Sequence, residues 1–105
     1  MGFFDFGDKA MIKTLAGRLM VGVDQLAREF DHSGGTSTPM ARGLAFALNK
    51  DIKEMLRLSN SLSESSRTSI LINMQGQNVQ LPQFFFTLKM ISNDYKNASG
   101  IEFYS

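Results

Sequence analysis

The sequence predicts an all-α fold, a small bundle of about four helices whose first two form an antiparallel helical hairpin. Two stretches repeat apolar residues at helical spacing, one between Ile12 and Phe30 and one between Leu44 and Leu56. A connector rich in Gly, Ser and Thr separates them, as between two packed helices. With 105 residues, of which 43% are hydrophobic, the chain is long enough for one domain, residues 1–105, with an ordinary core.

The first helix is expected over residues 8–31, with Asp8 as a candidate N-cap and an end near Gly34. Its apolar residues cover about half of the circumference, and charged residues fill the rest. Gly17 and Gly22 each cost helix propensity, on the order of 1 kcal/mol against Ala. We therefore expect them to permit the close approach of another helix.

The clearest boundary in the chain is the start of the second helix. Thr38 is a capping residue, and Pro39 fits the first helical position because its missing N–H has no helical partner there. The second helix is expected from Pro39 to about Leu58. A polar break over residues 59–66 follows, in which Ser61 and Glu64 have the spacing of a capping box.

Residues 67–81 allow two interpretations. Spacing of three and four between Ile70, Leu71 and Met74 fits a short helix, which we favour slightly. Alternation over residues 70–74 and 79–81 fits a β-hairpin that turns at residues 75–78.

Pro82 opens a final helix that presents apolar residues on more than one face. Phe84, Leu88, Ile91 and Tyr95 share one face, whereas Phe86 and Met90 lie on another and Phe85 lies between. The helix is therefore either covered on two sides or part of an oligomer interface. Residues 101–105 are expected to dock as an extended tail.

Composition argues against several chemistries. The chain has no Cys and one His, so it offers neither a thiolate nucleophile nor the usual zinc ligands. Asp31, His32 and Ser33 are adjacent in sequence, whereas members of a catalytic triad converge from distant positions. We expect no enzyme activity, no cofactor and no metal. We also expect a cytoplasmic protein, because no apolar run approaches a transmembrane segment and the acidic start does not resemble a signal peptide.

One residue of the second helix breaks its pattern. Phe46 lies opposite the apolar face, among four basic residues, which are Arg42, Lys50, Lys53 and Arg57. In the interpretation that we favour for the fold, another element covers Phe46. In the alternatives, an acidic partner, a second copy of the chain or a nucleic-acid backbone binds there. Asp51 is the opposite misfit, a carboxylate toward the apolar side, for which we expect a salt bridge to Arg18 or Arg28.

The function that these patterns favour is non-catalytic binding of a larger protein, as an adaptor, inhibitor or chaperone-like modulator. The candidate binding residues are those of the broken pattern together with an N-terminal aromatic cluster: Arg42, Phe46, Lys50, Lys53, Arg57, Phe3, Phe4 and Phe6. One alternative is nucleic-acid binding, because the spacing around Leu44 and Leu48 partly matches a helix-turn-helix, although a net charge of +1 disfavours it. Another alternative is a homo-oligomeric structural subunit, such as a homodimer, that joins through Phe85, Phe86 and Met90.

Overall fold

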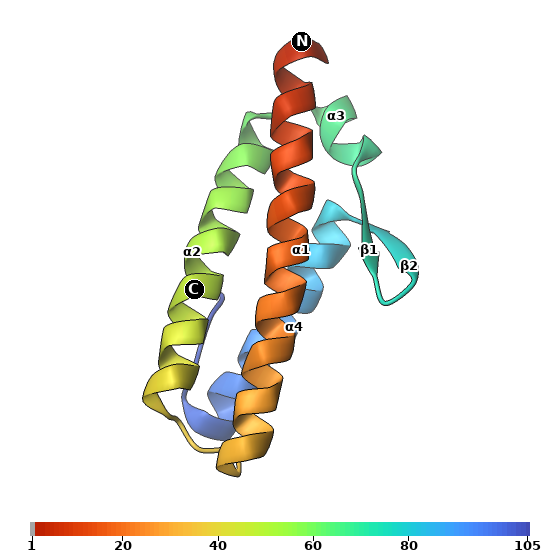
Figure 1. Cartoon of the computed structure of the whole chain (residues 1–105). Helices are drawn as coiled ribbons and strands as arrows, with labels where there is room; N and C mark the ends of the chain where they lie inside the picture. Colours follow the sequence, from red (N-terminus) through yellow and green to blue (C-terminus); the bar gives the residue numbers. More distant parts are fainter. Residues whose placement is uncertain (1) are drawn as a thin grey trace.

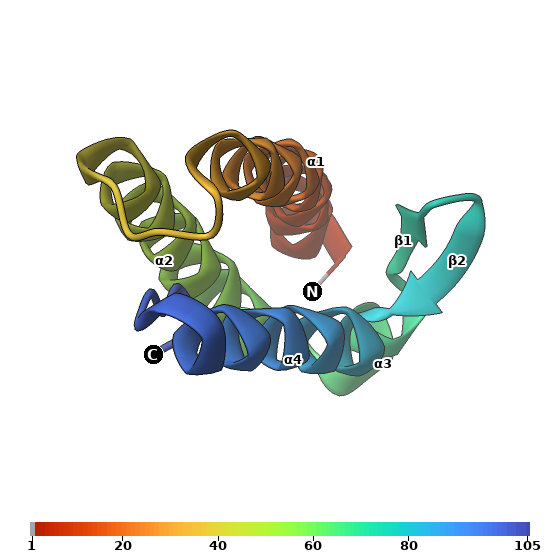
Figure 2. The ribbon, with the colours of Figure 1, turned by 90° about the horizontal axis from the view of Figure 1, so that it is seen from below.

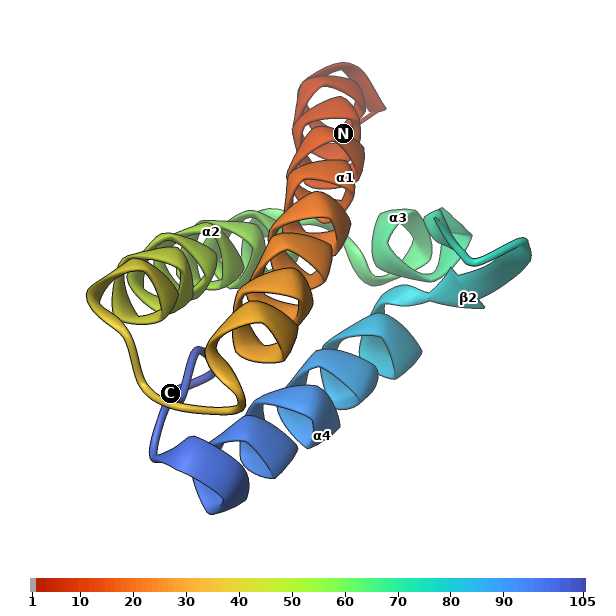
Figure 3. The ribbon, with the colours of Figure 1, turned by 60° about the horizontal axis from the view of Figure 1, so that its bottom comes forward.

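The computed structural model describes residues 2–105, with side chains from residue 7 onward, and it confirms the small helical bundle (Figure 1). Its elements in chain order are α1 (Gly2–Ser33), α2 (Pro39–Ser61), α3 (Glu64–Ser69), β1 (Leu71–Met74), β2 (Gln77–Gln80) and α4 (Leu81–Ser99). Helices α1 and α2 run antiparallel side by side, and α4 crosses beneath this pair on one side (Figures 2 and 3).

The start of α2 is as predicted. The Thr38 hydroxyl accepts a hydrogen bond from the backbone N–H of Ala41 at 3.0 Å, and it donates one to Glu29 of α1 at 2.6 Å. The cap therefore also joins the two helices across the connector. The end of α2 lies three residues beyond the expected Leu58, at Ser61.

The predicted start of α1 was wrong. Asp8 is not an N-cap but lies inside α1, where its carboxylate accepts a hydrogen bond from the Ser61 hydroxyl at 3.1 Å. A cap needs a free helix end, and α1 begins earlier, at Gly2. The expected close approach holds at Gly22, where an added Cβ would lie 2.5 Å from Leu48 Cδ2. Gly17 faces open space instead.

The favoured helix over residues 67–81 was also wrong, and the hairpin is present. Helix α3 ends at Ser69, and β1 pairs antiparallel with β2 from Leu71 opposite Gln80 to Met74 opposite Gln77. The two residues of the turn, Gln75 and Gly76, both have positive φ, as a type I′ hairpin turn requires. The predicted capping box was misplaced by two residues, since Ser63 caps α3 by accepting from the Ser66 N–H at 3.3 Å.

The core lies between the α1–α2 pair and α4. Helix α4 buries Phe84 and Leu88, and its other apolar face is exposed. The chain then turns at Gly100, whose φ of 82° ends the helix, and the expected tail docks on the core with Ile101 and Phe103 buried. Ser92 of α4, which is only 2% exposed, accepts hydrogen bonds from the backbone N–H groups of Phe103 and Tyr104 at 2.9 and 3.0 Å.

Candidate protein-binding surface

The structure brings the broken pattern of α2 together on one exposed surface, here called the basic face: Arg42, Phe46, Lys50, Lys53 and Arg57. Phe46 is 75% exposed, the highest value among the exposed large hydrophobic residues of the described chain. The interpretation that another element covers Phe46 was therefore wrong. Residues of the tail and Phe46 line the same hollow, and the Phe46 side chain stays exposed.

Most of the charge on the basic face is uncompensated. Arg57 forms a two-pronged ion pair with Glu54 through bonds of 2.8 and 2.6 Å, which lowers the pKa of Glu54 and raises that of Arg57, chiefly through the hydrogen bonds themselves. Lys50 and Lys53 make no ion pair within the described part of the chain. Four cations less one carboxylate leave +3 on this face, whereas the whole chain carries only +1.

The guanidinium of Arg42 is held without an acid. Its Nη1 donates to the Ser37 carbonyl oxygen at 3.4 Å and to the Ser37 hydroxyl at 3.2 Å. The remaining N–H groups of the fork make no hydrogen bond within the described residues, so they are available to a carboxylate.

A hollow of about 330 Å³ lies beside Phe46, between α2 and the tail. Its lining is Ser37, Arg42, Ala45, Phe46, Asn49, Gly100, Ile101, Glu102 and Ser105. The Asn49 side chain fixes the tail wall by donating to the Phe103 carbonyl oxygen at 3.0 Å and to the Ser105 hydroxyl at 2.9 Å. The sequence predicted a docked tail but not its position beside Phe46, because that position depends on contacts between residues that are 54 and 56 positions apart.

The other candidate residues of this surface, Phe3, Phe4 and Phe6, lie outside the side chains that the structure describes.

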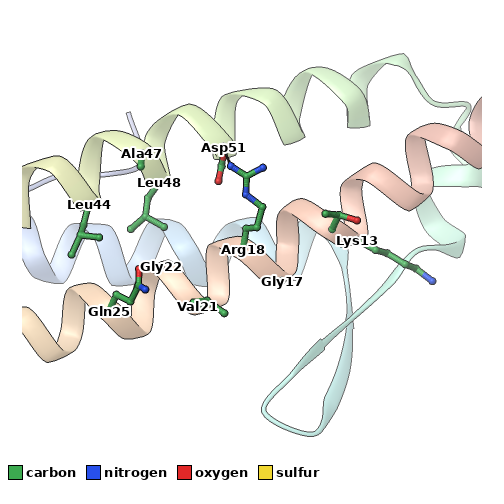
Figure 4. A pocket seen from close by; sticks show the side chains of 11 residues that line it. Lys13, Gly17, Arg18, Val21, Gly22, Gln25, Leu44, Ala47, Leu48 and Asp51 are labelled. Atoms are coloured by element: carbon green, nitrogen blue, oxygen red, sulfur yellow. Dashed lines mark hydrogen bonds and ion pairs between the residues drawn. The ribbon is translucent and has the colours of Figure 1, made fainter.

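A groove of about 610 Å³ runs along the open side of the α1–α2 pair (Figure 4). The predicted ion pair crosses it, with Arg18 Nη2 3.2 Å from Asp51 Oδ1 (Figure 4). The Asp51 side chain is 18% exposed and the Arg18 side chain 63%, so the groove admits water at this point. The role of Asp51 that the structure supports is therefore structural, as expected.

Sequence reasoning missed a second cleft, of about 600 Å³, between α1, the β-hairpin and α4. Its lining includes the apolar side chains of Met20, Val23, Val79 and Ile91, together with Asp24 and Gln side chains. No sequence pattern could have indicated this cleft, because its walls depend on the β-hairpin, which the sequence did not distinguish from a short helix.

The residues of the oligomer alternative are split between two environments. Phe86 and Met90 are exposed on the outer side of α4, at 57% and 53%. Phe85 is half-buried, and its ring lies edge to face with the ring of Phe84, with 6.1 Å between the ring centroids. The exposed pair is free for contact with another molecule.

The helix-turn-helix spacing was misleading, because α2 continues unbroken through Asn49, where that motif needs its turn.

Over the described residues, no cluster of three or more His, Cys, Asp or Glu side chains could hold a metal ion. Nor does any helix in the part of the chain that the structure describes have the length and apolar character to cross a membrane.

No protein-family model matches this chain, and it shows no significant similarity to curated proteins or to solved structures.

Proposed function

We propose that the protein is a non-catalytic binding module that recognises another protein through the basic face of α2. The observation that carries this proposal is the exposure of Phe46 among four cations, of which Lys50 and Lys53 form no ion pair with any residue that the structure describes. Aromatic and Arg side chains are enriched where protein interfaces are best packed, and an isolated exposed ring gains most from such burial.

The experiment is capture of partners from native lysate, with nuclease present, on the wild-type protein and on Phe46→Asp/Lys53→Glu. A matched control is Met11→Asp/Lys13→Glu, which makes the same kinds of change at an exposed apolar residue and an exposed Lys of α1. We expect a stoichiometric protein that the α2 variant loses and the α1 variant retains. Retention of the partner by both variants would refute the proposal. A partner that is captured only when the nuclease is left out would indicate nucleic acid.

The exposed pair on α4 supports a second candidate, a homo-oligomeric subunit. Phe86 and Met90 place an aromatic and a Met side chain on a surface strip of α4 that also carries the uncharged Asn93, with Lys89 and Asp94 on either side of it. Light scattering across a dilution series tests it. A dimer that Phe86→Asp dissociates would support this candidate, and a mass that stays monomeric would exclude it.

A further inference from the structure

We propose, on the basis of the proposed function, that the basic face binds an acidic segment of the partner protein. This segment places an apolar side chain against Phe46 and carries carboxylates on both sides of that side chain. The basic face would thus bind one chemical class of polypeptide. Charge complementarity along α2 is the first support for this assignment.

The cations flank Phe46 along the helix axis. Arg42 lies four residues before the ring and Lys50 four residues after it, which is one turn, or about 6 Å, on each side. Lys53 extends the same face by a further turn. An apolar anchor on the ring would therefore bring neighbouring carboxylates of its own chain within reach of Arg42 and Lys50.

The charges that meet such a segment are not already neutralised. Lys50 and Lys53 have no ion pair in the described chain, and Glu54 compensates Arg57 alone. Arg42 is also oriented in advance by its two hydrogen bonds to Ser37, so its binding loses less side-chain entropy. An acidic segment gains from all three cations, whereas a neutral or basic segment gains from none.

The hollow beside Phe46 favours a polypeptide over a nucleic acid. Ala45 and Ile101 give it apolar walls, and its volume of about 330 Å³ can admit part of an aliphatic or aromatic side chain. Glu102 in its lining is paired with Lys96 at 3.5 Å, and Glu54 is paired with Arg57, so neither carboxylate is free to oppose the carboxylates of the segment. Among the described residues, Phe46 is the only aromatic side chain in the lining, so stacked bases would find a single platform there.

Selection from a random peptide library tests the assignment without presupposing a sequence. Displayed peptides of about 16 residues, long enough to follow α2 over four turns as a helix, are selected on the wild-type protein. Counter-selection uses Phe46→Ala and, separately, Lys50→Glu/Lys53→Glu. The matched control is Lys89→Glu, which reverses an exposed Lys on α4.

We expect the enriched peptides to be acidic, with an apolar residue between the acids. Their affinity, measured by fluorescence anisotropy, should fall about tenfold with Phe46→Ala and at least as much with Lys50→Glu/Lys53→Glu, and stay unchanged with Lys89→Glu. Added salt should weaken the binding without abolishing it, because the apolar contact is insensitive to salt.

Several outcomes would overturn the inference: enrichment of neutral or basic peptides, acidic peptides that ignore the Phe46 and Lys changes, or no enrichment at all. Equal binding of single-stranded DNA would overturn it too, since the face would then accept any polyanion. The capture experiment separates the two levels of the argument. If the α2 variant still loses its partner while no acidic peptide is selected, the binding module stands and the acidic class falls.

Discussion

Gly22 sets how closely α1 approaches α2, and its replacement tests that contact directly. A Cβ at this position would lie 2.5 Å from Leu48 Cδ2 and 3.4 Å from Leu48 Cγ. Carbon atoms at rest are about 3.5 to 4.0 Å apart, so Gly22→Ala must displace the Leu48 side chain by about 1 Å. Leu48 is buried, and its displacement disturbs the core.

Two opposing terms decide the outcome for Gly22→Ala. Ala gains about 1 kcal/mol over Gly in a helix interior, and overpacking of a core costs about 1 to 3 kcal/mol. We therefore expect the free energy of unfolding to fall by about 0 to 2 kcal/mol. Gly17→Ala is the matched control in the same helix, where a Cβ meets nothing within 4 Å, and it should gain about 1 kcal/mol.

Urea unfolding followed by far-ultraviolet circular dichroism measures both variants. The sharpest readout is a cycle with Leu48→Ala, which removes both of the atoms that a Cβ at Gly22 would meet. In that background Gly22→Ala should become stabilising by about 1 kcal/mol. Equal stabilisation by Gly17→Ala and Gly22→Ala in the otherwise wild-type protein would refute the close approach.

Three further predictions follow from other contacts. Arg18→Met should lower the free energy of unfolding, measured in urea, by about 1 kcal/mol, because it leaves the mostly buried Asp51 carboxylate without its cation. An unchanged free energy of unfolding would mean that water takes the place of Arg18 beside this carboxylate. Ser92→Ala should lower the free energy of unfolding by about 1 to 3 kcal/mol and make the tail sensitive to limited proteolysis, because two backbone N–H groups of the tail lose their shared acceptor. An unchanged digestion pattern would show that Ser92 does not hold the tail in place. Burial raises the pKa of Tyr95, so the folded state favours the neutral phenol, and stability present below about pH 10 should be lost as the pH rises through the folded pKa. Tyr95→Phe should make unfolding less dependent on pH in that range, and an identical dependence would show that other groups are responsible.

The helical part of the fold could be predicted because its signals are local. The Thr38-Pro39 start depends on two adjacent residues, and the apolar repeats of α1 and α2 depend on spacings of three and four. The segment from Arg67 to Leu81 could not be settled in this way. Its apolar residues fit either period, and the turn that decides between them uses Gln75 with a φ of 52°, a conformation that Gln does not signal in advance.

The candidate surface was only half predictable. Helical spacing placed Phe46 and its cations on one face of α2, and the structure keeps them there. Whether the ring is covered depends on how the tail crosses α2, and that is determined by Asn49 and by burial of Phe103 rather than by any pattern near Phe46. Exposure of a side chain is a property of the whole fold, so a single helix does not determine it.

The docked tail also has a consequence for the order of folding. The α1–α2 pair closes across residues 34–38, whereas the Asn49–Phe103 contact joins residues 54 positions apart. Long loops close later because their entropy must be lost before the contact forms. We therefore expect the contacts between Asn49 and the tail to be absent from the folding transition state. In stopped-flow kinetics Asn49→Ala, which removes both of those contacts, should then speed unfolding and leave the refolding rate almost unchanged, so that the docking of the tail on α2 determines how long each native molecule persists.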